Sequence, residues 1–336
     1  MATQSTQLVL PRPGAADLEN PRSPIPAPTE ALFTATFGRL LPPAQFFTTP
    51  HGKAKAAYYD LPPTSSTPSK SPDRILFLHG VQTPALGMLP LARALHAAFP
   101  QAHCVLMDWY GHGLSETPVV PHDGTLFHAQ VDALLDHLAW PSAHFVSYSF
   151  GASETAQYVA ARGSRARVSS MALVAPAGLL RSGDWTDLQR SYIKGGGGSG
   201  DGGIEDEARR WILAFLEGGE LVVPADWEGR VARGEVVAEA VREWQMRMHP
   251  GHLASVVGVF RDGGVFDRHA DFAKAAGTGV ESVFVLGGLD DLCSPGYLEK
   301  VGFHNVHVVP EVGHGVVRER VPEVAALIGE FWKSIL

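Results

Sequence analysis

Cysteine is almost absent from this chain of 336 residues, which contains only Cys104 and Cys293. Two cysteines are too few for a disulfide framework, so a reduced intracellular chain is expected. The N-terminus also lacks a charged stretch followed by an apolar one, the pattern of a secretory leader. Its many prolines, with Asp17 and Glu19, argue against an organelle transit peptide. By elimination, these absences favour a cytoplasmic location.

An excess of positive charge and long apolar runs are also missing. The formal net charge is −8, so the composition gives no reason to expect a nucleic-acid partner. No apolar run is long enough to cross a bilayer, so no membrane span is expected. What is present, 45% apolar and 18% charged residues, fits a globular protein with a sizeable core. The oligomeric state stays open.

Short apolar runs alternate with helical patterns along much of the chain. Such alternation predicts an α/β fold with a mostly parallel, doubly wound sheet and helices on both faces. The first two runs flank a Pro-His-Gly-Lys turn and predict an antiparallel hairpin over 46–59. Further strands are expected at 74–78, 104–107, 144–146, 168–175, 282–286 and 306–309, and helices at 124–139, 204–216 and 236–248.

Composition divides the chain into four segments. Residues 1–30 are rich in proline and predict a flexible segment, followed by the first part of the core at 31–178. Residues 179–270 break the strand–helix rhythm and predict a helical cap, after which 271–336 complete the core. The glycine-rich stretch 195–203 has no Lys-Ser/Thr ending and no preceding strand, so it predicts a mobile loop that gates entry to the site instead of a phosphate cradle.

The strongest chemical signal is Ser149, in the stretch Ser147-Tyr148-Ser149-Phe150-Gly151. A strand is expected before this serine and a helix directly after it, the context of a nucleophile elbow. The usual pattern is Gly-x-Ser-x-Gly, because strand and helix approach closely and the serine adopts a strained backbone conformation. Here Ser147 replaces the first glycine and Gly151 keeps the second.

A serine hydroxyl needs a base within hydrogen-bond reach, and the base needs an orienting carboxylate. Two neighbouring aspartates, Asp290 and Asp291, follow the expected strand at 282–286, and His314 follows the strand at 306–309. The chain order of serine, then aspartate, then histidine is the order expected of such a triad. A strand-end serine, acid and base can therefore meet at one edge of the sheet.

This set of motifs resembles the α/β-hydrolase superfamily over about residues 45–178 and 275–336. The resemblance rests on the His79-Gly80 turn, the Asp-x-x-Gly-x-Gly-x-Ser stretch at 108–115, the elbow, and the aspartate and Gly-His pair. It implies Ser149 as nucleophile and His314 as base. The stretch at 108–115 is expected to be mainly structural.

The resemblance also implies the acid and the oxyanion hole. The family spacing Gly-x-x-Asp-x-x-x-Pro, read from Gly288 to Pro295, favours Asp291 as the acid. The alternative register, with Asp290 as the acid, loses the proline. Backbone N–H groups of Phe150 and Val81 are expected to form the oxyanion hole, with Gln82 as the alternative one residue later.

A serine at the elbow argues against dehalogenases and epoxide hydrolases of this fold, which need an aspartate there. The expected function is a serine hydrolase that cleaves an ester, lactone or thioester of an apolar small molecule through an acyl-enzyme. The turn at 175–179 resembles many fungal hydrolases of the superfamily, some from natural-product pathways. The alternatives are a carbon–carbon bond hydrolase of the same fold and a non-catalytic small-molecule receptor.

No cofactor is expected, and no metal site. His249 and His252 have a His-x-x-His spacing, but proline and glycine stand between them and no glutamate base is placed. The cap is expected to line the substrate pocket with apolar groups and few charges. Its aromatic residues are expected to form mainly the core of the cap, with one or two of them facing the pocket: Trp185, Trp211, Phe215, Trp227 and Trp244.

Overall fold

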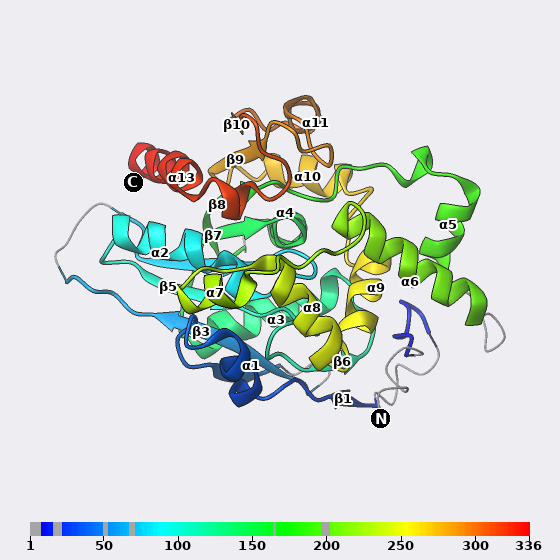
Figure 1. Cartoon of the computed structure of the whole chain (residues 1–336). Helices are drawn as coiled ribbons and strands as arrows, with labels where there is room; N and C mark the ends of the chain where they lie inside the picture. The colour runs from blue at the N-terminus through cyan, green and yellow to red at the C-terminus, as the bar shows by residue number, and fades with distance from the viewer. Residues whose placement is uncertain (1–7, 16–21, 50–52, 67–70, 164–165, 196–201) are drawn as a thin grey trace.

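Eight strands form one sheet at the centre of the computed structural model, which describes residues 8–15, 22–49, 53–66, 71–163, 166–195 and 202–336 (Figure 1). The strand order is β10-β9-β8-β7-β4-β5-β3-β2. The strands are β2 (Gln45–Thr48), β3 (Lys55–Leu61), β4 (Arg74–Leu78), β5 (His103–Met107), β7 (Ala143–Tyr148), β8 (Val168–Val174), β9 (Ser282–Gly287) and β10 (Val306–Val309).

The pairing confirms the predicted sheet. The six strands from β10 to β5 are parallel, while β3 pairs antiparallel with both β5 and β2. The β2–β3 pair is the predicted hairpin, with Phe46 opposite Ala57. Because β4, β7, β8, β9 and β10 all run the same way, their carboxyl ends meet at one edge, where the candidate site lies.

Successive residues of the central strands alternate between two apolar cores. Ile75 and Phe77 of β4 belong to one core, and Leu76 and Leu78 belong to the other. The first core includes helices α2 (Leu89–Ala98) and α13 (Val321–Ile335), and the second includes α3 (Gly124–His137) and α4 (Phe150–Arg162). A strand buried on both faces is mostly apolar, which is why β4 shows no polar alternation in the sequence.

The insertion between β8 and β9 is helical in its described residues and contains no strand there. Its helices are α5 (Asp187–Lys194), α6 (Gly202–Glu217), α7 (Trp227–Ala232), α8 (Ala238–Met248), α9 (His252–Asp262) and α10 (His269–Ala276). The last of these, α10, packs on α4 of the core, so the predicted cap boundary at residue 270 falls inside a helix. Residues 196–201 of the predicted gating loop lie outside the described residues.

The N-terminal segment, predicted to be flexible, makes specific contacts in the part that is described. Strand β1 (Arg22–Ile25) pairs antiparallel with β6 (Thr117–Val119). The side chain of Leu10 is buried, and Arg12 forms an ion pair with Asp262 of α9. The chain then enters the predicted core with helix α1 (Glu30–Phe37), which buries Phe33 and Phe37 against Trp244 of α8. Residues 1–7 and 16–21 of this segment lie outside the described residues.

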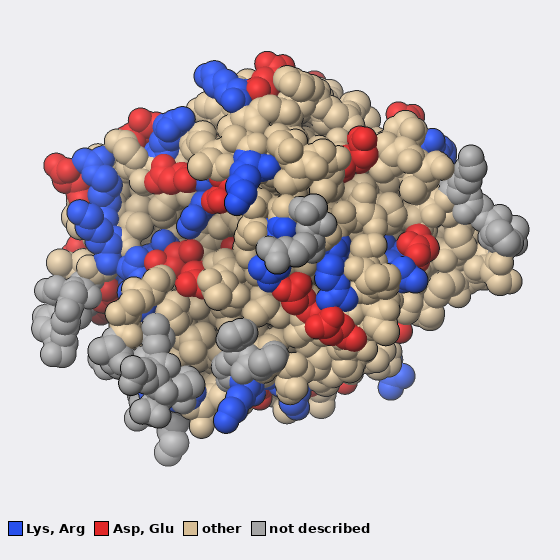
Figure 2. Space-filling view, turned by 180° about the vertical axis from the view of Figure 1, so that it is seen from behind, with Lys and Arg blue, Asp and Glu red and all other residues tan. Residues whose placement is uncertain are grey.

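Charged side chains are spread over the surface. On the face seen in Figure 2, lysine and arginine lie interspersed with aspartate and glutamate, without a broad patch of one sign. None of the helices in the described part of the chain is long and apolar enough to cross a membrane.

Candidate active site

Ser149 occupies the sharp turn between β7 and α4. Its backbone has φ 54° and ψ −115°, a conformation that costs energy for any residue with a Cβ atom. A Cβ atom at Gly151 would lie 2.6 Å from the carbonyl oxygens of Leu78 and His79, so only glycine fits there. At the other small position, the hydroxyl of Ser147 is buried and lies 2.7 Å from Oγ1 of Thr155. A hydrogen bond to helix α4 therefore accommodates the serine that replaces the usual glycine.

Three side chains from three strand ends form a continuous hydrogen-bonded chain. Oγ of Ser149 lies 2.9 Å from Nε2 of His314, and Nδ1 of His314 lies 2.9 Å from Oδ2 of Asp290. The carboxylate can only accept, so Nδ1 carries the proton and Nε2 accepts from the serine hydroxyl. The side chain of Asp290 is fully buried, while that of His314 is 31% exposed.

The carboxylate beside His314 is Asp290, so the placement of Asp291 at that position is wrong. Asp290 N–H closes a turn onto the carbonyl of Gly287, and Oδ1 of Asp290 accepts from the amide of Leu292. This turn points Asp290 inward and leaves Asp291 exposed. The proline that favoured Asp291 is Pro295, at the start of helix α11 (Pro295–Lys300), which Ser294 caps. The proline spacing thus marks a helix start and does not fix which aspartate faces the histidine.

The loop that carries His314 is held close to the sheet. A Cβ atom at Gly287 would lie 2.2 Å from the carbonyl oxygen of Gly313, so glycine at the end of β9 allows the approach. The hydroxyl of Tyr148 donates to the carbonyl of His314, and the two rings lie 5.2 Å apart between centroids. Tyr148, next to the serine, therefore connects the elbow to the histidine loop.

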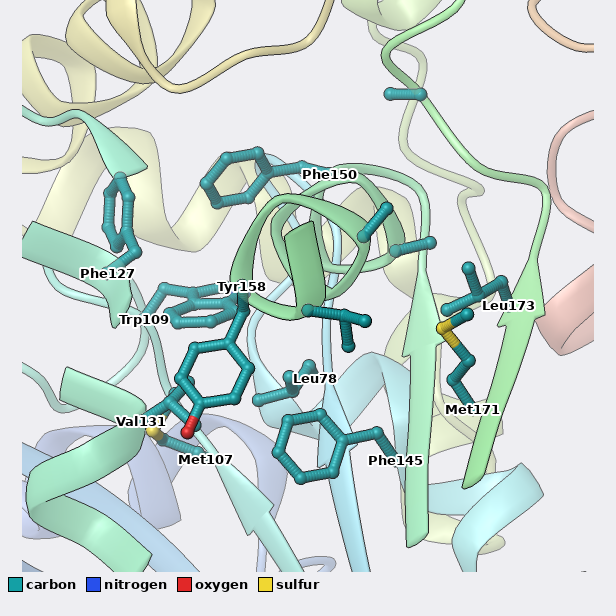
Figure 3. Packing of buried hydrophobic residues seen from close by; sticks show 14 of the residues in the cluster. Leu78, Met107, Trp109, Phe127, Val131, Phe145, Phe150, Tyr158, Met171 and Leu173 are labelled. Atoms are coloured by element: carbon teal, nitrogen blue, oxygen red, sulfur yellow. The ribbon is translucent and has the colours of Figure 1, made fainter. Parts of the chain in front are cut away.

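The amides of Val81 and Phe150 have no hydrogen-bond acceptor among the described residues. The amide of Gln82 differs, because it donates to Nε2 of His112. Of the two alternatives for the second donor, the geometry therefore favours Val81 over Gln82. The ring of Phe150 packs against Trp109 and Phe127 (Figure 3), which holds the first turn of α4 against the core.

Gln245 of α8 connects the loop after β4 to the inserted helices, and no motif in the sequence marks this role. The side chain of Gln245 is fully buried. Its amide nitrogen donates to the carbonyl of Gln82, and its Oε1 accepts from the amide of Gly113 at 2.7 Å. Gln82 itself has φ 64°, so this hydrogen bond helps to hold a strained residue next to Val81.

The stretch from Asp108 to Ser115 is structural, as predicted. The carboxylate of Asp108 accepts from the hydroxyl of Tyr59 and from the amides of Ala85 and Leu114. Burial raises the pKa of Asp108 to about 6, and these three hydrogen bonds oppose the rise. A Cβ atom at Gly113 would overlap this carboxylate, which explains the glycine there.

Several histidines near this loop are buried, and they bond to its backbone. Among the described residues, no group of three or more His, Cys, Asp or Glu side chains is placed to hold a metal ion. His249 bonds to the carbonyl of Ser115 and His252 to that of Gly111, so both support the loop. Nε2 of His79 accepts from the amide of Trp109. Burial lowers the pKa of His79 and of His252 to about 3 and that of His249 to about 4.

A cavity of about 250 Å³ opens over Ser149 and His314. One part is apolar and includes Trp185, Phe215 and Phe260. The prediction of few charges is wrong, because five charged residues also line the cavity: Glu217, Glu239, Arg242, Arg318 and Glu319. As predicted, only some of the aromatic residues of the insertion face the cavity, since Trp227 and Trp244 pack against Phe37 instead.

Comparisons with known proteins agree with this architecture. The family model described as alpha/beta hydrolase fold matches residues 73–217. A search of curated protein sequences finds no match to this chain. Among solved structures, an enol-lactonase from Burkholderia xenovorans LB400 is 17% identical with a TM-score of 0.61, covering 86% of this chain and 100% of that one.

Two further solved structures show the range of activities on this fold. A haloalkane dehalogenase from Agrobacterium tumefaciens C58 is 18% identical with a TM-score of 0.63, covering 90% of this chain and 99% of that one. A carboxylesterase structure from the thaumarchaeon Nitrososphaera gargenis is 14% identical with a TM-score of 0.60, covering 87% of this chain and 98% of that one. At these low sequence identities, the similarity establishes a shared fold and not a shared activity. The chain therefore has the α/β-hydrolase fold, and the family model of that description matches its residues 73–217.

Proposed function

We propose that this protein is a serine hydrolase that cleaves an ester, lactone or thioester of a small molecule through Ser149, His314 and Asp290. The observation that carries the proposal is the hydrogen-bonded chain from Oγ of Ser149 through both ring nitrogens of His314 to Oδ2 of Asp290. This chain borders a cavity large enough for a small substrate. A serine nucleophile needs this arrangement of base and orienting acid.

In the first half of the reaction, Oγ of Ser149 attacks the carbonyl carbon while Nε2 of His314 takes the hydroxyl proton. Asp290 keeps the proton on Nδ1 and stabilises the imidazolium that forms. The amides of Phe150 and Val81 receive the developing oxyanion, each worth about 3 kcal/mol in comparable sites. His314 then gives its proton to the leaving group, and the acyl group remains on Ser149.

In the second half, His314 removes a proton from water, which attacks the acyl carbon; the bond to Ser149 Oγ then breaks, His314 returns the proton to that oxygen, and the acid leaves. The elbow serine argues against haloalkane chemistry, although a dehalogenase shares the fold. Displacement of a halide from carbon on this fold uses a carboxylate nucleophile, and Ser149 cannot supply one.

A fluorophosphonate probe tests the proposal directly, because it labels an activated serine. We expect labelling of the wild-type protein and none of Ser149→Ala, with Ser153→Ala as a control, since Ser153 lies on α4 and bonds to the carbonyl of Gly264. A panel of p-nitrophenyl esters of graded chain length then defines the acyl group. Absence of labelling together with tight binding of an intact ester would favour the receptor alternative.

A further inference from the structure

The charged part of the cavity contains two arginines in different surroundings. Arg242 of α8 is paired with two carboxylates, 2.9 Å from Glu217 and 3.2 Å from Glu239. Arg318 of α12 (Val316–Glu319) forms no ion pair with any described carboxylate, and its Nη1 atom is buried without a hydrogen-bond partner. A buried guanidinium nitrogen without an acceptor is energetically costly, so an anion at this point would be stabilising.

The carboxylates that line the cavity do not neutralise Arg318 by direct pairing. The side chain of Glu217 is 7% exposed and already bound to Arg242, and its pKa is raised by burial, with Arg242 and Arg318 opposing the rise. The other two carboxylates reach solvent: the side chain of Glu239 is 36% exposed, and Glu319 is an exposed residue. Solvent screens those two charges more strongly than the buried ones. Arg318 is half-buried, with its Nη1 atom enclosed, and thus remains as a positive charge without a carboxylate partner among the residues that line the cavity.

Arg318 is also fixed relative to the reacting serine. Its guanidinium carbon lies 5.4 Å from the centroid of the Tyr148 ring, a cation–π contact. Tyr148 precedes Ser149 in the chain, and its ring packs against that of His314. A planar guanidinium can bind a carboxylate through N–H donors, and Nη1 of Arg318 is a donor that has no partner within the described residues.

We propose that the natural substrate carries a carboxylate, which Arg318 binds while Ser149 attacks the ester or lactone carbonyl elsewhere in the same molecule. This inference rests on the proposed function and adds a substrate class to it. The apolar part of the cavity then holds the hydrocarbon portion of the substrate. The carboxylate is a recognition group and takes no part in the bond changes at Ser149.

Matched esters test the inference. One series contains mono-p-nitrophenyl esters of succinic, glutaric, adipic and pimelic acid, and the other contains neutral p-nitrophenyl esters of the same acyl lengths. We expect wild-type kcat/KM to favour the anionic ester at one chain length. Arg318→Gln should lower kcat/KM for that ester by about 10- to 100-fold, chiefly through KM, and change the neutral series by less than about threefold. Arg318→Lys should restore part of the preference.

Arg320→Gln is the control for loss of a nearby positive charge, because Arg320 bonds to Glu323 and to the carbonyl of Pro310 and does not line the cavity. A wild-type preference for neutral esters at every length would overturn the inference. So would an equal loss on both series in Arg318→Gln, which would mean that Arg318 only supports Tyr148 and the His314 loop.

A binding experiment separates this inference from the proposed function. In the Ser149→Ala protein, calorimetry should show tighter binding of monomethyl adipate than of methyl hexanoate, and Arg318→Gln should abolish the difference. This readout needs no turnover. If it succeeds while fluorophosphonate labelling fails, the carboxylate site stands without the hydrolase. If labelling succeeds and this preference is absent, the hydrolase stands and the carboxylate site is refuted.

Discussion

Asp290 and His314 share a hydrogen bond of 2.9 Å, although the residue next to Asp290 is a second aspartate whose side chain faces solvent. The two neighbours form a matched pair for mutagenesis. Asp290→Asn should lower kcat by about three to four orders of magnitude, because the amide favours the wrong imidazole tautomer. Asp291→Asn should change kcat by less than about threefold. Steady-state kinetics on the best p-nitrophenyl ester measures both, and a larger loss in Asp291→Asn would contradict the assignment.

Gly151 should tolerate no side chain. In Gly151→Ala the new Cβ atom would lie 2.6 Å from two backbone oxygens at the end of β4, and backbone cannot move aside cheaply. We expect destabilisation of about 1–3 kcal/mol together with loss of ester turnover, since the elbow must shift. Urea denaturation and an ester assay report the two effects. Gly183→Ala is the control, because a Cβ atom there meets nothing within 4 Å, and it should leave both unchanged.

Gln245 should affect the reaction indirectly, because its hydrogen bond to Gln82 helps to position the neighbouring Val81 amide. Gln245→Glu keeps the acceptor for the amide of Gly113 but loses the donor to the carbonyl of Gln82. We expect kcat to fall about tenfold with little change in KM, because the position of the Val81 amide matters more to the transition state than to the bound substrate. A rise in KM alone would show that Gln245 shapes the cavity and not the oxyanion hole. Gln189→Glu is the control, since glutamate can keep the capping box of α5.

Stability should fall as the pH falls below about 6.5. Burial is the main cause that lowers the pKa of each of five histidines in the folded protein: His79, His112, His122, His249 and His252. The unfolded chain binds their protons first, so each histidine costs up to about 1.4 kcal/mol per pH unit below 6.5.

Asp108 changes stability with pH in the opposite direction to the histidines. Its folded pKa is raised to about 6 by burial, so its contribution to stability is present at low pH and is lost as the pH rises through 6. One carboxyl does not offset five histidines. Urea unfolding at pH 5, 6 and 7 measures the net slope. A free energy of unfolding that stays constant or rises from pH 6.5 to pH 5 would refute the assignment of these histidines as neutral in the fold.

Much of this fold can be predicted from sequence because its signals are local. Continuous apolar runs mark strands that are buried on both faces, and β4 and β10 begin and end where the pattern predicts. Strand β6 is missed because it has only three residues, one of them proline, and its partner β1 lies in a proline-rich segment. Pairing between two short irregular segments has no local signature.

The candidate site also contains residues that the sequence predicts and residues that it does not. Ser149 and His314 can be predicted because each stands among small residues at a strand end. The choice between Asp290 and Asp291 cannot, because one residue of turn geometry decides which carboxylate points inward. Gln245 and Arg318 leave no motif at all. Gln245 acts through a hydrogen bond to a residue far away in the chain. Arg318 stands out only because its Nη1 atom has no hydrogen-bond partner within the described residues, which the fold decides.

The long insertion has a consequence for synthesis of the chain on the ribosome. Strand β9 pairs with β8, yet the ribosome must add everything from residue 175 to residue 281 before the first residue of β9 exists. Until then, β8 is an edge strand whose hydrogen-bonding groups face no partner, and such edges attract other chains. Asp290 and His314 arrive later still, so Ser149 has neither base nor acid while the chain is incomplete. The nascent protein should therefore need chaperone protection late in translation, and a chain cut before residue 282 should aggregate and show no serine reactivity.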